Sequence, residues 1–238
     1  MDWLDPNDED INENAMILAD AIVVSRGGNE PFWDDEAKAL CVGLLLFVAT
    51  DPSEHMNRNL ARVRDILTST RQEFEDFLNT MLACNNRIVQ STAARTLSKE
   101  EKLRSSVLAT LQSHTHFLDS PRIRRSLMRS DFRFEDLKTT KMTVYLVLPS
   151  DRLDAFGRWL RLLIQQAITV NARNIEQKPD KPVLFLLDEM AALGRLTMIE
   201  QAFGLMAGFG MQLWGIVQDL SQLERKAAGV ALNLMFRY

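Results

Sequence analysis

Apolar residues recur at helical spacing through the first half of the chain. After Asp34, the apolar residues Ala37, Leu40, Cys41, Leu44 and Val48 follow the i, i+3, i+4 spacing of one helix face. Between Gly43 and Gly157 the chain contains no glycine and only three prolines. Because glycine and proline interrupt helices, their scarcity is typical of stacked helices. We therefore expect an all-helical region of five to seven helices over residues 11–128.

Capping patterns mark several helix starts within this region. Residues 70–73 and 98–101 both have the Ser/Thr-x-x-Glu pattern of a capping box, in which the hydroxyl and the carboxylate bind amide groups of the first turn. Ser120 followed by Pro121 is typical of an N-cap with proline at the first helical position. These patterns predict helices that begin near residues 71, 99 and 121.

After residue 131 the pattern changes to short apolar runs that alternate with helical spacing. The expected elements are a strand over Met142–Leu148, a helix over 151–177, a strand over Val183–Leu187, a helix over 196–207 and a strand over Met211–Val217. Strands without polar alternation are expected where helices cover both faces of a sheet, and such sheets are mainly parallel. The sequence therefore predicts an α/β fold that follows the helical region.

Composition is that of a globular protein. The chain has 238 residues, of which 46% are hydrophobic and 25% charged, so collagen-like, disordered and disulfide-rich classes are excluded. Cys41 and Cys84 lie in apolar helical sequence without C-x-x-C spacing, which predicts two buried thiols. The longest apolar run, Ala39–Ala49, is 11 residues long. A membrane span needs ~20, so we expect no transmembrane segment here.

Charge is distributed unevenly along the chain. Residues 1–36 hold eleven acidic side chains and one basic one, although the net charge of the whole chain is only −4. A basic cluster lies between residues 121 and 141; its members are Arg122, Arg124, Arg125, Arg129, Arg133, Lys138 and Lys141. A solvated face and a polyanion-binding face both fit this cluster. The candidates for nucleic-acid contact are Arg122, Arg124, Arg125 and Arg129.

Polar residues follow two of the predicted strands. Asp188 and Glu189 come directly after the strand 183–187, and Gln218 follows the strand 211–217. In an open parallel sheet, ligands bind beyond the carboxyl ends of the strands. There an aspartate can hold Mg²⁺, a glutamate can take a proton from water and a glutamine can contact a γ-phosphate. Together these residues resemble a Walker B strand with a sensor, although an Asp-Glu pair is also common at solvated strand ends.

Other catalytic patterns are weaker or missing. A phosphate-binding loop requires a Gly-Lys dipeptide, and the chain has none. His55, His114 and His116 lack the i, i+4 spacing of a helical metal site, so we expect surface positions for them. Arg158 and Arg161 on the helix 151–177 are expected to face solvent or to reach phosphate.

Several strings of sequence resemble the TraG/TraD-type coupling proteins of type IV secretion and conjugation. In order along the chain they are WLDP at 3–6, PFW at 31–33, SDF at 130–132, TVYLVLP at 143–149, RWLR at 158–161, VLFLLDEMAALGRL at 183–196 and QDLSQL at 218–223. Such proteins are membrane-anchored hexameric ATPases with a RecA-like motor domain and an inserted helical domain. The resemblance thus implies a partial, mainly parallel RecA-like P-loop NTPase sheet plus an all-helical domain.

The resemblance also implies domains and site roles. Residues 1–10 would end a preceding motor segment, 11–128 would be the helical domain that faces cargo or DNA, and 129–238 would be part of the nucleotide-binding domain. With ATP and Mg²⁺ as cofactors, Asp188 would bind the metal, Glu189 would be the catalytic base and Gln218 the phosphate sensor. The implied partners are relaxosome or effector proteins, channel components, possible DNA and further copies in a hexamer.

Departures from the family pattern limit what this chain can do alone. The membrane helices and the P-loop of the family would lie upstream of Met1. Some members carry an arginine before the glycine turn at 208–210, where this chain has Ala207. We therefore expect the chain to be inactive alone, and the longer protein to act at the cytoplasmic face of the inner membrane. A non-catalytic adaptor or cargo-binding module is the alternative.

Overall fold

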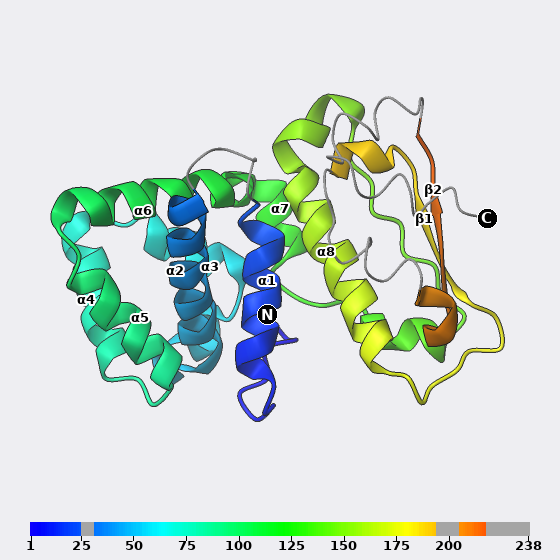
Figure 1. Cartoon of the computed structure of the whole chain (residues 1–238), viewed down its shortest axis with the longest axis horizontal. Helices are drawn as coiled ribbons and strands as arrows, with labels where there is room; N and C mark the ends of the chain where they lie inside the picture. The colour runs from blue at the N-terminus through cyan, green and yellow to red at the C-terminus, as the bar shows by residue number, and fades with distance from the viewer. Residues whose placement is uncertain (25–30, 194–204, 218–238) are drawn as a thin grey trace. The chain divides into compact units, whose positions relative to one another are not determined.

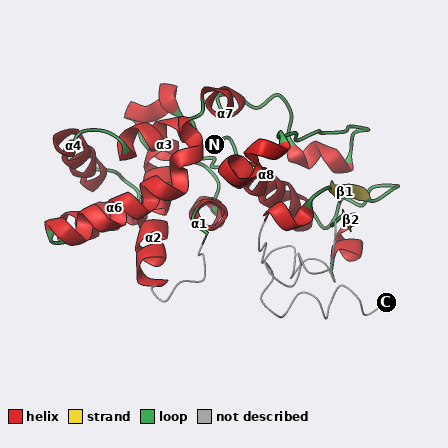
Figure 2. Cartoon of the chain, turned by 90° about the horizontal axis from the view of Figure 1, so that it is seen from above, coloured by secondary structure: helices red, strands yellow, loops and turns green. Residues whose placement is uncertain are grey.

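The computed structural model describes residues 1–24, 31–193 and 205–217 of the chain (Figure 1). The chain divides into two units, Met1–Ser130 and Asp131–Tyr238. Figure 2 shows that the described part of the first unit consists of helices and loops, whereas the strands belong to the second. The helical character predicted for the first part of the chain is thus confirmed.

Seven α-helices and two 3₁₀ turns make up the described part of the first unit. They are α1 (Ile11–Ile22), α2 (Pro31–Thr50), η1 (Pro52–Asn57), α3 (Leu60–Leu67), α4 (Arg71–Leu82), α5 (Arg87–Leu97), α6 (Glu101–Thr115), η2 (His116–Asp119) and α7 (Pro121–Ser126).

Helix α2 is the centre of this unit. Leu44, Leu45 and Leu46 are each fully buried, although they are consecutive and so lie on different sides of the helix. Helices α1, α3, α5 and α6 pack against α2. A helix that is apolar on all sides has to be enclosed by neighbours, so the longest apolar run of the sequence is the core of this unit. Among the described helices, none combines the length and apolar character that a membrane crossing requires.

The helix starts show where capping patterns succeed and fail. Thr70 and Glu73 form the predicted capping box at the start of α4. The box predicted at 98–101 is wrong, because Ser98 ends α5 and its hydroxyl donates to the carbonyl of Arg95. A hydroxyl beside a helix end can serve the preceding helix as well as the next one. Ser120 precedes Pro121 at the start of α7 as predicted, without a side-chain capping bond.

One buried arginine links three elements of the first unit. Arg64 on α3 donates from Nε and Nη2 to the carboxylate of Asp119, over 2.8 and 2.6 Å. Its Nη1 donates to the carbonyl of Gln112 and to the hydroxyl of Thr115. The hydrogen bonds from Arg64 lower the pKa of Asp119 below its ordinary value of 3.8. Since every partner is a good acceptor, the guanidinium is accommodated in the interior.

The cysteines agree with the prediction and one histidine does not. Cys41 and Cys84 are buried free thiols, and burial raises the pKa of Cys41 to about 12. His55 and His116 are exposed as expected, but His114 is buried. His114 continues the buried face of Val107 and Leu111 on α6, and its Nε2 lies 3.1 Å from Oδ1 of Asp34 on α2. The packing of α6 on α2 therefore decides the position of His114, which the spacing of metal ligands on a helix does not predict.

The second unit combines one long helix with two parallel strands. Its described elements are η3 (Phe134–Lys138), η4 (Ser150–Arg152), α8 (Leu153–Arg173), β1 (Val183–Leu187), η5 (Met190–Leu193), η6 (Met206–Phe209) and β2 (Met211–Gly215). β1 pairs with β2 in register from Val183 opposite Met211 to Leu187 opposite Gly215. The predicted parallel arrangement is confirmed for these strands. The helix predicted over 196–207 lies mostly outside the described residues.

The strand predicted over Met142–Leu148 is wrong. Its residues alternate between half-buried and exposed as in a strand: Leu146 packs against the core of the second unit, whereas Tyr145 and Val147 are 82% and 75% exposed. The structure nevertheless assigns this run no ladder with a described strand. Apolar alternation predicts the extended backbone, but a strand also requires a neighbour for its backbone hydrogen bonds.

Helices are expected to cover both sheet faces, and the described residues show this for one face; for the other it stays a prediction, since residues 194–204 and 218–238 lie outside the described ones. Phe185 and Leu187 are buried against α8, whereas Leu184 and Leu186 on the opposite face are 47% and 56% exposed. Within the part of the chain that the structure describes, α8 covers one face only. An apolar strand sequence shows that both faces suit burial, but the neighbouring elements decide which faces are buried.

Replacement of Gly43 by alanine should destabilise the first unit. A Cβ at this position on α2 would lie 2.4 Å from Cγ2 and 2.6 Å from Cβ of Thr92 on α5, so the helices would have to separate. Overpacking and the helix propensity of alanine act in opposite directions, and we expect a net loss of about 1–2 kcal/mol in urea unfolding. Gly208→Ala is the control, since nothing lies within 4 Å of its Cβ position. Equal effects of the two variants would contradict the prediction.

Asp119 should contribute to stability at neutral pH and lose that contribution in acid. Its pKa is lowered by Arg64, so the ionised carboxylate stabilises the folded chain above the ordinary value of 3.8, and the effect is lost as pH falls through the folded pKa. Asp119→Asn should therefore lower the urea midpoint at pH 7. Between about pH 5 and pH 2.5 it should lose less stability than the original chain. The exposed Asp35→Asn is the control; an unchanged acid slope in Asp119→Asn would refute the assignment.

Candidate functional site

A tight turn follows β1 and carries the two acidic residues predicted for a nucleotide site. Asp188 is exposed and Glu189 is half-buried. Oδ1 of Asp188 accepts a hydrogen bond from the backbone N–H of Glu189 over 3.1 Å. Glu189 has a φ of 53°, in the left-handed region that non-glycine residues rarely adopt. Strained backbone of this kind is concentrated at functional sites, and persists where its surroundings determine it.

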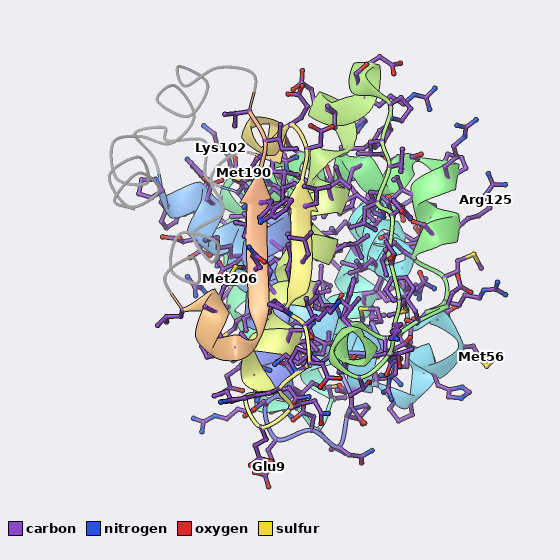
Figure 3. All side chains as sticks on the ribbon, turned by 90° about the vertical axis from the view of Figure 1, so that its right-hand side faces the viewer. Glu9, Met56, Lys102, Arg125, Met190 and Met206 are labelled. Atoms are coloured by element: carbon purple, nitrogen blue, oxygen red, sulfur yellow. The ribbon has the colours of Figure 1, made fainter. Side chains whose placement is uncertain are left out.

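The end of β2 holds this turn in place. Ile216 donates its N–H to the carbonyl of Leu187 over 2.9 Å, and its own carbonyl accepts the N–H of Met190 over 3.0 Å. A Cβ on Gly215 would lie 2.5 Å from Sδ of Met190, so glycine permits this approach. Figure 3 shows Met190 at the carboxyl end of the strands and Met206 at their other end. The acidic turn therefore lies at the edge where parallel sheets bind ligands.

The third predicted residue, Gln218, lies outside the described residues. β2 ends at Gly215, and the described chain continues to Val217. The structure thus places Asp188 and Glu189 in one turn beside the end of β2, and the roles of all three residues stay predictions.

The acidic turn is chemically suited to Mg²⁺. Carboxylate oxygens are the ligands that Mg²⁺ prefers, and it is usually held by one or two carboxylates, together with waters and substrate phosphates. The exposed carboxylate of Asp188 offers such a ligand. Across the described ranges, no group of three or more His, Cys, Asp or Glu side chains could hold a metal ion by itself. These residues therefore do not favour a metal that is bound by protein side chains alone. Asp188 instead suits a metal ion that a nucleotide phosphate also binds.

The expectation that Arg161 faces solvent or phosphate is wrong. Arg161 is buried, and its Nη1 donates to the carbonyl of Leu193 over 2.9 Å. Burial, with a smaller effect of Arg158, lowers the pKa of Arg161 to about 10, so it remains charged at neutral pH. Its neighbours in the sequence indicate this burial, because Leu160 and Ile164, one and three positions away, belong to the buried face of α8.

The basic cluster of residues 121–141 is divided between the two units, at the boundary between Ser130 and Asp131. Arg122 and Arg125 are exposed on α7, and Figure 3 shows the outward side chain of Arg125. Arg124 instead pairs with Asp65 over 2.8 Å and donates to the carbonyl of Leu118. Lys138 belongs to the second unit and is buried, which lowers its pKa. The surface charge available to a polyanion is therefore smaller than the sequence indicates.

A cavity of about 600 Å³ opens among α1, α2 and α5 of the first unit. Apolar residues from all three helices line it, including Met16, Leu40 and Ile88. Glu36 at its wall is buried and pairs with Arg95 and with Lys99. The sequence does not predict this cavity, because helical periodicity shows which side of a helix faces inward but not whether neighbouring helices fill the space.

Known proteins match almost the whole chain. The family model described as Type IV secretory system Conjugative DNA transfer matches residues 1–230. Protein VirD4 of Rhizobium rhizogenes is 26% identical over 221 residues, which cover 92% of this chain and 32% of that protein. The conjugal transfer protein TraG of Escherichia coli is 24% identical over 89% of this chain and 36% of its own length. The chain thus spans about a third of the curated relatives that it matches.

Solved structures show the same fold. The conjugative coupling protein TrwB without its first 70 residues aligns with a TM-score of 0.72 and 15% identity, over 94% of this chain and 51% of that one. TrwB in complex with ADP and Mg²⁺ aligns with a TM-score of 0.71 and 16% identity, over 95% and 52%. The RecA-like sheet with an added helical domain, expected from the resemblance, is thereby confirmed. With 230 of its residues inside the family model, the chain belongs to the type IV secretory system conjugative DNA transfer family.

Proposed function

We propose that this chain is the helical unit and the Walker B part of a coupling-protein ATPase. Such a protein would recruit DNA–relaxase complexes or protein effectors to a type IV secretion channel and drive their transfer by ATP hydrolysis. The observation that carries this proposal is the acidic turn: Asp188 and Glu189 follow a parallel strand at its carboxyl end, with Glu189 held in a left-handed conformation. The family match supports it, and the solved relative TrwB binds ADP and Mg²⁺.

The roles of the residues follow from their chemistry and position. Asp188, exposed beyond β1, would hold Mg²⁺, while the half-buried Glu189 would accept the proton of the attacking water. When bound, Mg²⁺ supplies positive charge that offsets the charge developing on the phosphates. Gln218, three residues beyond the end of β2, would contact the γ-phosphate. A phosphate-binding loop is not among this chain's residues, so it would come from the rest of the motor domain.

The assembly and location belong to the same proposal. The motor would be a homo-hexamer, and it would act at the cytoplasmic face of the bacterial inner membrane with its channel components. The relaxosome or effector cargo would meet the helical unit. The match to VirD4 and TraG proteins, which are about three times as long as the aligned segment, supports a larger machine of which this chain is a part.

Glu189→Gln should separate ATP binding from ATP hydrolysis. In a coupling protein that contains this segment together with a phosphate-binding loop, the variant should retain ATP and lose turnover by about 10²-fold or more, because the amide cannot take a proton from water. ATP binding is measured by equilibrium titration, and turnover by phosphate release. Glu176→Gln, an exposed change of the same kind, is the control. Full turnover by Glu189→Gln, or tight Mg-ATP binding by the 238-residue chain alone, would contradict the proposal.

The exposed arginines of α7 should contribute to any DNA contact of the helical unit. Replacement of both Arg122 and Arg125 by alanine should weaken DNA binding and reduce its log-log salt slope by about 2, since each phosphate contact releases about one counterion. Fluorescence anisotropy at several salt concentrations measures both quantities. Arg87→Ala with Lys102→Ala removes the same charge from exposed positions elsewhere in the unit. If both double variants behave alike, α7 is not a specific DNA contact.

A non-catalytic adaptor is the second candidate function. The open, mostly apolar cavity among α1, α2 and α5 favours it, because such a surface can receive a partner without any nucleotide. The Glu189 test discriminates between the two functions. An adaptor would keep its full effect on substrate transfer after Glu189→Gln, whereas the motor would retain its cargo but stop transferring it.

A further inference from the structure

We propose that Arg161 is a positioning residue that holds the acidic turn, and with it the carboxylate of Glu189, in its working geometry. This inference rests on the proposed function, in which Glu189 takes a proton from water. Arg161 lies on α8, 28 positions before Glu189 in the sequence, and it donates to the carbonyl of Leu193 at the end of η5, the segment that follows the acidic turn.

The segment that directly follows the acidic turn, η5 (Met190–Leu193), is anchored at its two ends by different elements. At its start, the N–H of Met190 bonds to the carbonyl of Ile216, the residue after β2. At its end, Nη1 of Arg161 bonds to the carbonyl of Leu193, whose side chain is itself buried in the core of the second unit. Glu189 precedes this anchored segment and carries the left-handed φ of 53°. A backbone conformation that is intrinsically unfavourable requires such surroundings to persist.

A buried arginine at this position is unexpected unless its charged guanidinium makes a specific interaction. The buried residues of α8 nearest to Arg161 are apolar, among them Leu160, Leu162 and Ile164. Desolvation of a guanidinium is unfavourable, as the lowered pKa of Arg161 reflects, and an apolar side chain would avoid it. The last carbonyls of a helical turn have no partner within that turn, and a cation is the strongest donor for them. The unfavourable desolvation of Arg161 is therefore offset by its hydrogen bond to the backbone that follows Glu189.

A purely structural role for Arg161 makes a different prediction. If Arg161 only stabilised the second unit, its loss would loosen α8, β1 and the turn together and would act on hydrolysis only through the folded fraction. If it positions Glu189, its loss should loosen the segment 189–193 selectively, and it should slow hydrolysis without weakening ATP binding.

The experiment compares three variants at Arg161 with a matched control. Arg161→Met removes the donor and the charge, Arg161→Gln keeps an N–H donor, and Arg161→Lys keeps the charge. Arg152→Met, an exposed arginine just before α8, is the control. Amide hydrogen exchange is measured in the 238-residue chain, and kcat and KM for ATP are measured in the coupling protein with its phosphate-binding loop.

Arg161→Met should raise the exchange rate of the Met190 amide about tenfold or more, with little change at the amides of β1. It should lower kcat by about 10- to 100-fold, with KM changed less than about twofold, because small displacements of a catalytic group slow chemistry strongly. Arg161→Lys should restore part of both quantities, and Arg152→Met should change neither. If Arg161→Met fails to fold, Arg161→Gln and Arg161→Lys carry the same comparison.

Uniform loosening of the second unit, or local loosening with unchanged kcat, would overturn the positioning role. Full turnover in Glu189→Gln would instead overturn the proposed function, and the exchange measurements would still show whether Arg161 holds the turn. The failure of one proposal is thus distinguishable from the failure of the other.

Discussion

The parallel pairing of β1 with β2 is the interaction on which the candidate site depends. Its hydrogen bonds continue past the strands, where Ile216 joins Leu187 to Met190 and closes the turn that carries Glu189. Because parallel strands end at the same edge, this pairing also brings Ile216, directly after β2, to the same side of the sheet as Asp188. The chemistry proposed for Asp188 and Glu189 thus depends on one ladder of backbone hydrogen bonds.

Helix α8 covers one face of the two strands and so supports the candidate site at their carboxyl end. Its apolar residues bury Phe185 and Leu187, and its Arg161 reaches across the core to the carbonyl of Leu193. In the first unit, α2 has the corresponding role: it is enclosed by neighbouring helices, and the close contact of Gly43 with Thr92 sets its distance from α5. In both units a central apolar element positions polar groups that are distant in the sequence.

Much of the fold was predictable from local pattern. The bounds of β1, the capping box of α4, the start of α7 and the buried thiols of Cys41 and Cys84 depend on nearby residues, and all agree with the structure. The predictions that failed concern longer-range contacts. The run 142–148 alternates like a strand but pairs with no described strand. His114 was expected at the surface, but it is buried where α6 packs on α2. Arg161 was expected to face solvent or phosphate, but it is buried.

The sequence by itself determined the all-helical first unit, the parallel strands, the family and the acidic pair that follows β1, because helical periodicity, apolar runs and motif strings are local properties of the chain. Only the tertiary structure decided the left-handed backbone of Glu189, the burial of Arg161 against the carbonyl of Leu193 and the division of the basic cluster between two units. These features arise where segments far apart in the sequence meet. There, desolvation and hydrogen bonding across the core, rather than local propensity, set each residue's position.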